Sequence, residues 1–170
     1  MRPIVVYDPI TESVKFTRPE GQVSGFRDTP AIVSNHSGKK VAINDIIRCN
    51  SITLLFFGNA ECEDTMDIIP ELKEMVDAAR LLRRKIEVVY IPAYTISSHH
   101  ANQWEERNHF MKHHGDWYYM NYNPIKSKNA KKMHWVKEIP AIVMLGSNGV
   151  IIDSQAERNM SMLRDTVIFN

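Results

Sequence analysis

The chain contains few cysteines, no marked excess of charge of one sign and no long apolar run. Its 170 residues include only Cys49 and Cys62, too few for a disulfide framework and in agreement with a reducing compartment. The formal net charge is +1, so no global field favours nucleic acid or an anionic membrane as a partner. No apolar run approaches the roughly 20 residues of a membrane span, and the N-terminus lacks a secretory signal. We therefore expect an intracellular, cytoplasmic protein, with the nucleus as the alternative location.

The apolar side chains that are present suffice for one core. They make up 44% of the sequence, which fits a single compact domain. The first thirty residues carry two short β-like runs that are interrupted by prolines and glycines. We predict that residues 31–170 form the domain and that residues 1–30 form an N-terminal extension or an edge hairpin.

The pattern of apolar residues predicts the order of strands and helices. Continuous apolar runs predict buried strands at 52–57 and 86–91. Turn-rich tetrapeptides at 35–38 and 146–149 predict hairpins that join 31–33 to 41–43 and 141–145 to 150–153. Helical spacing predicts a long helix at 62–82 and shorter helices at 101–114, 124–135 and 156–167. This order predicts an α/β fold with a mixed central sheet flanked by helices.

Cys62 is the main candidate for chemistry, because it lies where the apolar strand 52–57 gives way to the long helix. The unpaired N–H groups and partial positive charge of a helix N-terminus favour a thiolate. Glu61, Glu63 and Asp64 oppose a further negative charge at the same place. Cys49 lies beyond the other end of the strand, so we predict that the two thiols are not bonded to each other.

A second cysteine three residues after Cys62 would complete a disulfide-exchange pair, but that position holds Thr65. Thr65 can donate a hydrogen bond to the sulfur, yet it cannot close a ring. A mixed disulfide on Cys62 must therefore be broken by a thiol from outside the chain. Two functions remain open: one-thiol exchange with a client protein or a glutathione-like small thiol, or client binding without redox chemistry. We expect no cofactor in either case.

Several motifs of the chain resemble the thioredoxin superfamily. They are the apolar strand that leads to Cys62, the helix that begins there, Pro70 eight residues on, and Ile139-Pro140 before a strand and hairpin. More narrowly, the chain resembles the nucleoredoxin and tryparedoxin branch, over about residues 31–156. The motifs that carry this narrower resemblance are Asn35-His36-Ser37-Gly38-Lys39-Lys40-Val41, Leu54-Leu55-Phe56-Phe57, Val88-Val89-Tyr90-Ile91, Trp117 and Glu138-Ile139-Pro140-Ala141-Ile142-Val143.

The resemblance implies a thioredoxin-like three-layer fold and a degenerate site, with Cys-Glu-Asp-Thr in place of Cys-x-x-Cys. It implies that Cys62 and Thr65 occupy the catalytic positions. It also implies a cis bond before Pro140, so that residue 139 presents its backbone beside Cys62 to an extended peptide. The residues expected to contact a client are Glu61, Glu63, Asp64, Ile139 and Pro140. Thioredoxins proper have a buried carboxylate under the site, and Phe56 stands at that place here.

Two histidines in the predicted helix 101–114 could suggest a metal site, but the sequence does not support one. His109 and His113 lie four residues apart on one helix, but zinc usually has three or four ligands and no cysteine pair lies near. We interpret the helix as solvated and expect no metal.

A basic patch follows between residues 126 and 137. It can meet an acidic partner or a phosphate, or it can simply be the solvated face of a helix. Its members are Lys126, Lys128, Lys131, Lys132 and Lys137, with His134 and Trp135.

Overall fold

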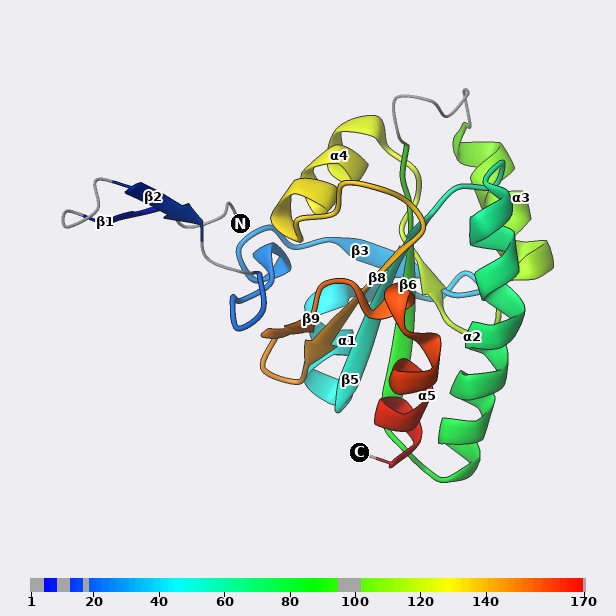
Figure 1. The fold of residues 1–170 in the computed structure, drawn as a ribbon. Helices are drawn as coiled ribbons and strands as arrows, with labels where there is room; N and C mark the ends of the chain where they lie inside the picture. Colours follow the sequence, from blue (N-terminus) through cyan, green and yellow to red (C-terminus); the bar gives the residue numbers. More distant parts are fainter. Residues whose placement is uncertain (1–4, 9–12, 17–18, 95–101, 170) are drawn as a thin grey trace.

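The computed structural model describes residues 5–8, 13–16, 19–94 and 102–169 (Figure 1). The strands in these ranges are β1 (Val5–Asp8), β2 (Ser13–Phe16), β3 (Ile32–Ser34), β4 (Lys40–Ala42), β5 (Ile52–Gly58), β6 (Ile86–Pro92), β7 (Tyr118–Tyr119), β8 (Ala141–Gly146) and β9 (Ile151–Asp153). The helices are η1 (Gly25–Arg27), α1 (Ile43–Cys49), α2 (Glu63–Leu81), α3 (Gln103–His113), α4 (Pro124–Met133), η2 (Ala156–Arg158) and α5 (Met160–Phe169). None of the helices in these ranges has both the length and the apolarity to cross a bilayer.

The predicted mixed sheet is confirmed, with seven strands in the order β4-β3-β7-β6-β5-β8-β9. Its central strand, β5, pairs in parallel with β6 and antiparallel with β8. Both predicted hairpins are present as β3-β4 and β8-β9. A parallel pair needs a crossover between its strands, and α2 supplies it here between β5 and β6.

Both faces of the sheet are covered, which explains why all seven residues of β5 are buried. Alternate side chains of a strand point to opposite faces. Leu54 and Phe56 pack with the core residues of α2, α3 and α5. Leu55 and Phe57 pack with those of α1 and α4 on the other face. The two helical layers therefore hold β5, and with it the segment that leads to Cys62, from both sides.

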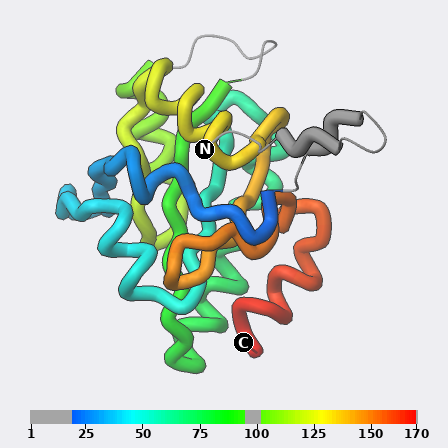
Figure 2. The backbone as a smooth tube through the Cα atoms, turned by 90° about the vertical axis from the view of Figure 1, so that its left-hand side faces the viewer, coloured from blue at the N-terminus to red at the C-terminus, as the bar shows by residue number. Residues whose placement is uncertain are grey.

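β1 and β2 pair with each other and not with the seven-stranded sheet. The β-like runs predicted at 4–7 and 14–16 correspond to these two strands, and residue 4 lies outside the described residues. Residues 19–24, which come after β2, lie along the β8-β9 hairpin (Figure 2). The N–H of Gly21 donates to the Ile151 carbonyl at 2.8 Å, and the N–H of Ser24 donates to the Gly149 carbonyl at 2.8 Å. These bonds cover part of the sheet edge.

Asparagine side chains determine where three of the predicted helices begin. Asn102 accepts a hydrogen bond from the N–H of Glu105 at 2.8 Å, so α3 begins at Gln103. Asn123 caps α4 in the same way. Asn159 accepts from the N–H of Met162 at 3.0 Å, which divides the helix predicted at 156–167 into η2 and α5.

The prediction of a solvated histidine face on α3 is wrong. His109 is 7% exposed and His114 is 5% exposed. The indole N–H of Trp117 donates to Nδ1 of His114 at 3.2 Å, so Nε2 of His114 carries the proton toward Nε2 of His109, also 3.2 Å away. Burial lowers the pKa of His109 to about 4. The histidines are thus neutral parts of the core, and no group of three or more metal-ligating side chains occurs within the described ranges.

His134 is also buried, so its assignment to the basic patch is wrong. It is fully inaccessible to solvent and lies 5.1 Å from the ring of Phe26. Its Nδ1–H donates to the Ala130 carbonyl at 2.8 Å, and its Nε2 accepts from the Ser24 hydroxyl at 2.7 Å. Burial lowers the pKa of His134 to about 4. A neutral imidazole therefore joins the N-terminal segment to the end of α4.

A pH-dependent loss of stability should follow from His134. Its pKa is lower in the folded state than in the unfolded state, so its contribution is complete above about pH 6.5 and is lost as the pH falls towards 4. We expect the difference in unfolding free energy between wild type and His134→Gln to shrink by up to about 3 kcal/mol over that interval. Urea unfolding at several pH values measures it, and a difference that stays constant would contradict the assignment.

Candidate functional site

The candidate site is built around Cys62, which caps the N-terminus of α2. Its backbone is extended, its N–H donates to the Asn59 carbonyl at 3.1 Å, and its own carbonyl accepts from the N–H of Met66 at 3.1 Å. The thiol makes no capping hydrogen bond and is half-buried. Cys49 is also a free thiol, which confirms that the two cysteines are not bonded to each other. Within the described residues, neither a disulfide nor a capping hydrogen bond therefore engages the sulfur of Cys62.

Asn59 holds the loop between β5 and α2, and the sequence analysis missed it. The residue is fully buried. Its amide donates to the Ala93 carbonyl at 3.2 Å, while its Oδ1 accepts from the N–H of Glu61 at 2.8 Å. A polar residue directly after a buried strand was the available signal. Asn59 thus ties the residues before Cys62 to the end of β6.

Thr65 points into the protein from the first turn of α2. It is fully buried, and its Oγ1 accepts from the N–H of Asn59 at 3.3 Å. Among the described residues no hydrogen bond joins its hydroxyl to the sulfur of Cys62. A β-carbon on Gly58 would lie 2.6 Å from Cγ2 of Thr65, so the strand end and the helix start are in tight contact. Thr65 is a positioning residue for the loop.

The Ile139–Pro140 segment lies at the same end of the sheet as Cys62. Ala141, the first residue of β8, pairs with Phe57 near the end of β5. The Ile139–Pro140 peptide bond is cis, and both residues are half-buried. They line a cavity of about 820 Å³ together with Asp64 of the first turn of α2. The structure therefore brings Asp64, Ile139 and Pro140 to one cavity.

Exposed carboxylates surround the thiol. Glu61, Glu63 and Asp64 are all exposed. Asp64 faces the cavity beside Pro140, and the charge of Glu61 helps to raise the pKa of Tyr94 on the other side of the loop. The surface around Cys62 is consequently acidic.

A buried carboxylate also lies under the loop, and the sequence analysis missed it. Phe56 is buried at the place where thioredoxins proper have such a group, but Glu106 of α3 supplies a fully buried carboxyl from another direction. Its Oε1 accepts from the N–H of Ala60 at 3.0 Å, and its Oε2 accepts from the hydroxyl of Tyr90 at 3.0 Å. A single glutamate on a polar helix gave no sequence signal.

Burial is the main cause of the pKa shifts of Glu106 and Tyr90. It raises the pKa of Glu106 to about 7, although the hydrogen bonds from Ala60 and Tyr90 act in the opposite direction. It also raises the pKa of Tyr90 well above its ordinary value, and the negative charges of Glu106 and Cys62 add to this effect. Tyr90 therefore stays protonated and donates to the Glu106 carboxyl.

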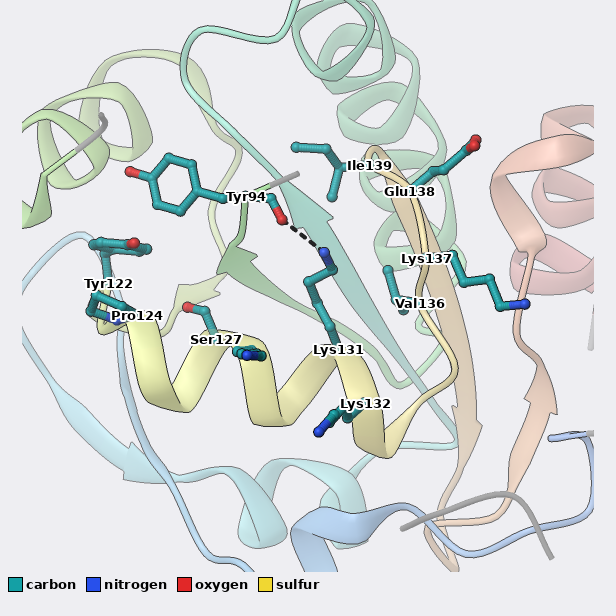
Figure 3. Close-up of a pocket in the computed structure, with 11 residues that line it drawn as sticks. Tyr94, Tyr122, Pro124, Ser127, Lys131, Lys132, Val136, Lys137, Glu138 and Ile139 are labelled. Atoms are coloured by element: carbon teal, nitrogen blue, oxygen red, sulfur yellow. Dashed lines mark hydrogen bonds between the residues drawn. The ribbon is translucent and has the colours of Figure 1, made fainter. Parts of the chain in front are cut away.

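The structure gathers part of the predicted basic patch around a second cavity, of about 950 Å³, on the other side of the 136–139 segment (Figure 3). Lys126 is not among its lining residues, and His134 is buried. The lysines that line it are Lys128, Lys131, Lys132 and Lys137.

Comparison with known proteins gives the family. The model of the family described as Thioredoxin-like matches residues 50–151, and the chain belongs to this family. No curated protein matches the sequence.

Solved structures agree with the fold. A thioredoxin from Wuchereria bancrofti is 20% identical, with a TM-score of 0.64 over 78% of this chain and 86% of that one. Tryparedoxin I from Leishmania major is 12% identical, with a TM-score of 0.63 over 79% of this chain and 86% of that one. A putative protein disulfide isomerase from Bacteroides thetaiotaomicron is 10% identical, with a TM-score of 0.64 over 98% and 92%. At these identities the likeness shows the fold, which is thioredoxin-like.

Gly58→Ala should destabilise the protein, because the new methyl group would overlap the buried side chain of Thr65. We expect a loss of about 1–3 kcal/mol in the free energy of unfolding, measured by urea denaturation. Adding Thr65→Ser removes the methyl group that is hit and should recover part of the loss. Gly146→Ala is the control, since its nearest contact is the Asn148 amide at 3.1 Å. Equal losses in both glycine variants would contradict this account.

Glu106→Gln should change the pH dependence of stability in the direction opposite to His134. The folded-state pKa of Glu106 is raised, so wild type loses stability as the pH rises from about 4.5 to about 7. Relative to wild type, Glu106→Gln should gain up to about 3 kcal/mol between pH 5 and pH 8 in chemical denaturation. The exposed neighbour Glu105 provides the control as Glu105→Gln. The assignment fails if both variants show the same pH dependence.

Proposed function

We propose that this protein is a nucleoredoxin-type thioredoxin-like protein that engages clients through the single thiol of Cys62, and that it performs at most one-thiol exchange. The observation that carries the proposal is the half-buried, unbonded thiol at the start of α2, at the same sheet end as the cis Ile139–Pro140 bond. The position of a resolving cysteine is taken by Thr65, which is buried. The partner is a client protein or a small, glutathione-like thiol inside the cell, in the cytoplasm or the nucleus.

The chemistry of the proposal is half of a disulfide-exchange cycle. The thiolate of Cys62 attacks one sulfur of a disulfide, a new bond forms to that sulfur, and the other sulfur leaves as a thiolate. Thr65 has no sulfur with which to break the new bond. The mixed disulfide therefore persists until an external thiol attacks it, which regenerates Cys62.

The rest of the site supports this role by holding the loop. Asn59 of the loop itself, Thr65 of α2 and Glu106 of α3 each accept a hydrogen bond from a backbone N–H of the loop. The backbone N–H and carbonyl of Ile139 form no hydrogen bond with another described residue, so they can pair with an extended client segment. We place this function in a domain of residues 31–170, to which residues 1–30 are appended.

A second candidate function is client binding without redox chemistry on the same surface. The buried Thr65 at the position of a resolving cysteine favours it, because the site lacks the second sulfur of a disulfide-exchange cycle. In this case the Ile139–Pro140 edge alone would bind the client.

Reaction with glutathione disulfide separates the two functions. The reference protein is Cys49→Ser, because Cys49 is exposed and would react as well. We expect a mixed disulfide to accumulate on Cys62, detected by intact mass, at least as fast as on a free model thiol. It should be absent in Cys49→Ser/Cys62→Ser. A rate below that of the model thiol over the range from pH 6 to pH 9 would remove one-thiol exchange and leave the binding function.

The variant Cys49→Ser/Thr65→Cys tests whether a second thiol at position 65 can resolve the mixed disulfide on Cys62. The introduced thiol should attack the mixed disulfide, release glutathione and leave an internal disulfide, so that the glutathione adduct no longer accumulates. Persistence of the adduct in this variant would show that the fold, and not the absent sulfur, prevents completion of the cycle.

A further inference from the structure

The cavity beside α4 combines a partly apolar wall with a basic rim. Rings and aliphatic chains from the segment after β6, from α4 and from the residues on either side of α4 form the wall. The rings of Tyr94 and Tyr122 meet edge to face at 4.8 Å. Figure 3 shows Lys131 and Lys132 of α4 among the residues that line this space. Glu138 is the carboxylate among the lining residues. The cavity therefore has a basic character that the neutral chain as a whole lacks.

Two side-chain hydrogen-bond donors that line the cavity are already engaged. The Ser127 hydroxyl donates to the Pro92 carbonyl at 2.6 Å, and the Lys131 ammonium donates to the Tyr94 carbonyl at 2.7 Å (Figure 3). Lys128, Lys132 and Lys137 are exposed, and none of them forms an ion pair with another described residue. Available positive charge is thus confined to the rim.

The basic cavity shares one wall with the cavity that Asp64, Ile139 and Pro140 line. Residues 136–139 line both spaces. On the far side of this wall lie Glu157, Arg158 and, from the first turn of α2, Asp64. A segment that crosses Ile139 thus passes from an acidic surface to a basic one.

We propose that the basic cavity binds the acidic side chains of a client segment that lies across Ile139 and Pro140. The protein then selects clients that carry aspartate or glutamate on one side of the cysteine that meets Cys62, and not on the other. This inference rests on the proposed function, because it names the chemistry of the client that the same face engages.

Two features favour peptide carboxylates over a phosphate group. A phosphate site gathers several donors on one anion, such as the backbone N–H groups of a helix N-terminus or a nest. Here Ser127 and Lys131 donate to carbonyl groups, and the remaining cations are the exposed side chains of Lys128, Lys132 and Lys137. Spaced carboxylates on an extended chain suit this arrangement, and the unpaired backbone of Ile139 continues it toward Cys62.

Binding of labelled peptides to the full-length Cys62→Ser variant tests the inference without redox chemistry. Three peptides of equal length carry serine at the centre, with three glutamates before it, three glutamates after it, or glutamines on both sides. We expect one glutamate arrangement to bind about tenfold more tightly than the glutamine peptide at low salt, and the advantage to fade as salt rises. Fluorescence anisotropy measures the affinities.

Charge reversal locates the binding. Lys128→Glu/Lys132→Glu should abolish the preference, whereas the control Lys112→Glu/Lys126→Glu makes the same change in net charge outside the cavity and should retain it. The inference is overturned if the three peptides bind equally or if the two glutamate peptides bind with the same affinity. It is also overturned if the control variant loses as much of the preference for the glutamate peptide as the cavity variant does. Displacement of the peptide by inorganic phosphate, but not by chloride of equal ionic strength, would also overturn it in favour of a phosphate site.

A covalent version keeps the inference separate from the proposed function. In Cys49→Ser, peptides with a thionitrobenzoate-activated cysteine at the centre should transfer to Cys62: the new disulfide forms to the peptide sulfur, and thionitrobenzoate leaves as the coloured anion. If all peptides react no faster than with a model thiol, one-thiol exchange fails while the anisotropy result still decides the charge preference. If all react quickly but at one rate, exchange stands and the charge preference fails.

Discussion

The hydrogen bonds that fix the loop between β5 and α2 are the constraint on which the candidate site depends. β5 is buried on both faces and paired on both edges, so its end has one position relative to the rest of the sheet. The hydrogen bond between the Asn59 N–H and the Thr65 side chain holds the first turn of α2 against the end of β5, and the bond from the Asn59 amide to the Ala93 carbonyl holds the loop against the end of β6. The thiol of Cys62 is thereby placed by buried polar groups, and it makes no capping bond of its own.

Glu106 connects the loop to two further elements of the fold. Its carboxyl bonds to the loop on one side and to Tyr90 of β6 on the other, so α3, β6 and the Cys62 loop are linked by one buried group. Such a group is costly to ionise, which raises its pKa to about 7 and makes the support of the loop sensitive to pH near neutrality. The buried histidines respond in the opposite sense, because burial lowers their pKa values.

The surface around the thiol is divided by charge although the chain is nearly neutral. Acidic residues surround the start of α2, whereas lysines of α4 and Lys137 surround the cavity on the other side of residues 136–139. A net charge of +1 conceals this separation. Local charge of both signs at one face suits the recognition of an extended segment more than it suits a small symmetric ligand.

The fold class and the place of Cys62 could be predicted from the order of residues, because apolar runs and turn residues act locally. β5, α2 and both hairpins follow from neighbours within a few residues. Which polar groups are buried could not be predicted in this way, because it depends on contacts between distant parts of the chain. Asn59, Glu106 and His134 bond to partners between 34 and 110 residues away or pack against a distant element, and no local pattern marks them. The same holds for the basic cavity: the lysines of α4 read as a solvated helix face until the approach of Tyr94 and Ile139 gives that face a concave shape. Burial and concavity arise from contacts between distant segments, which is why they could not be read along the chain.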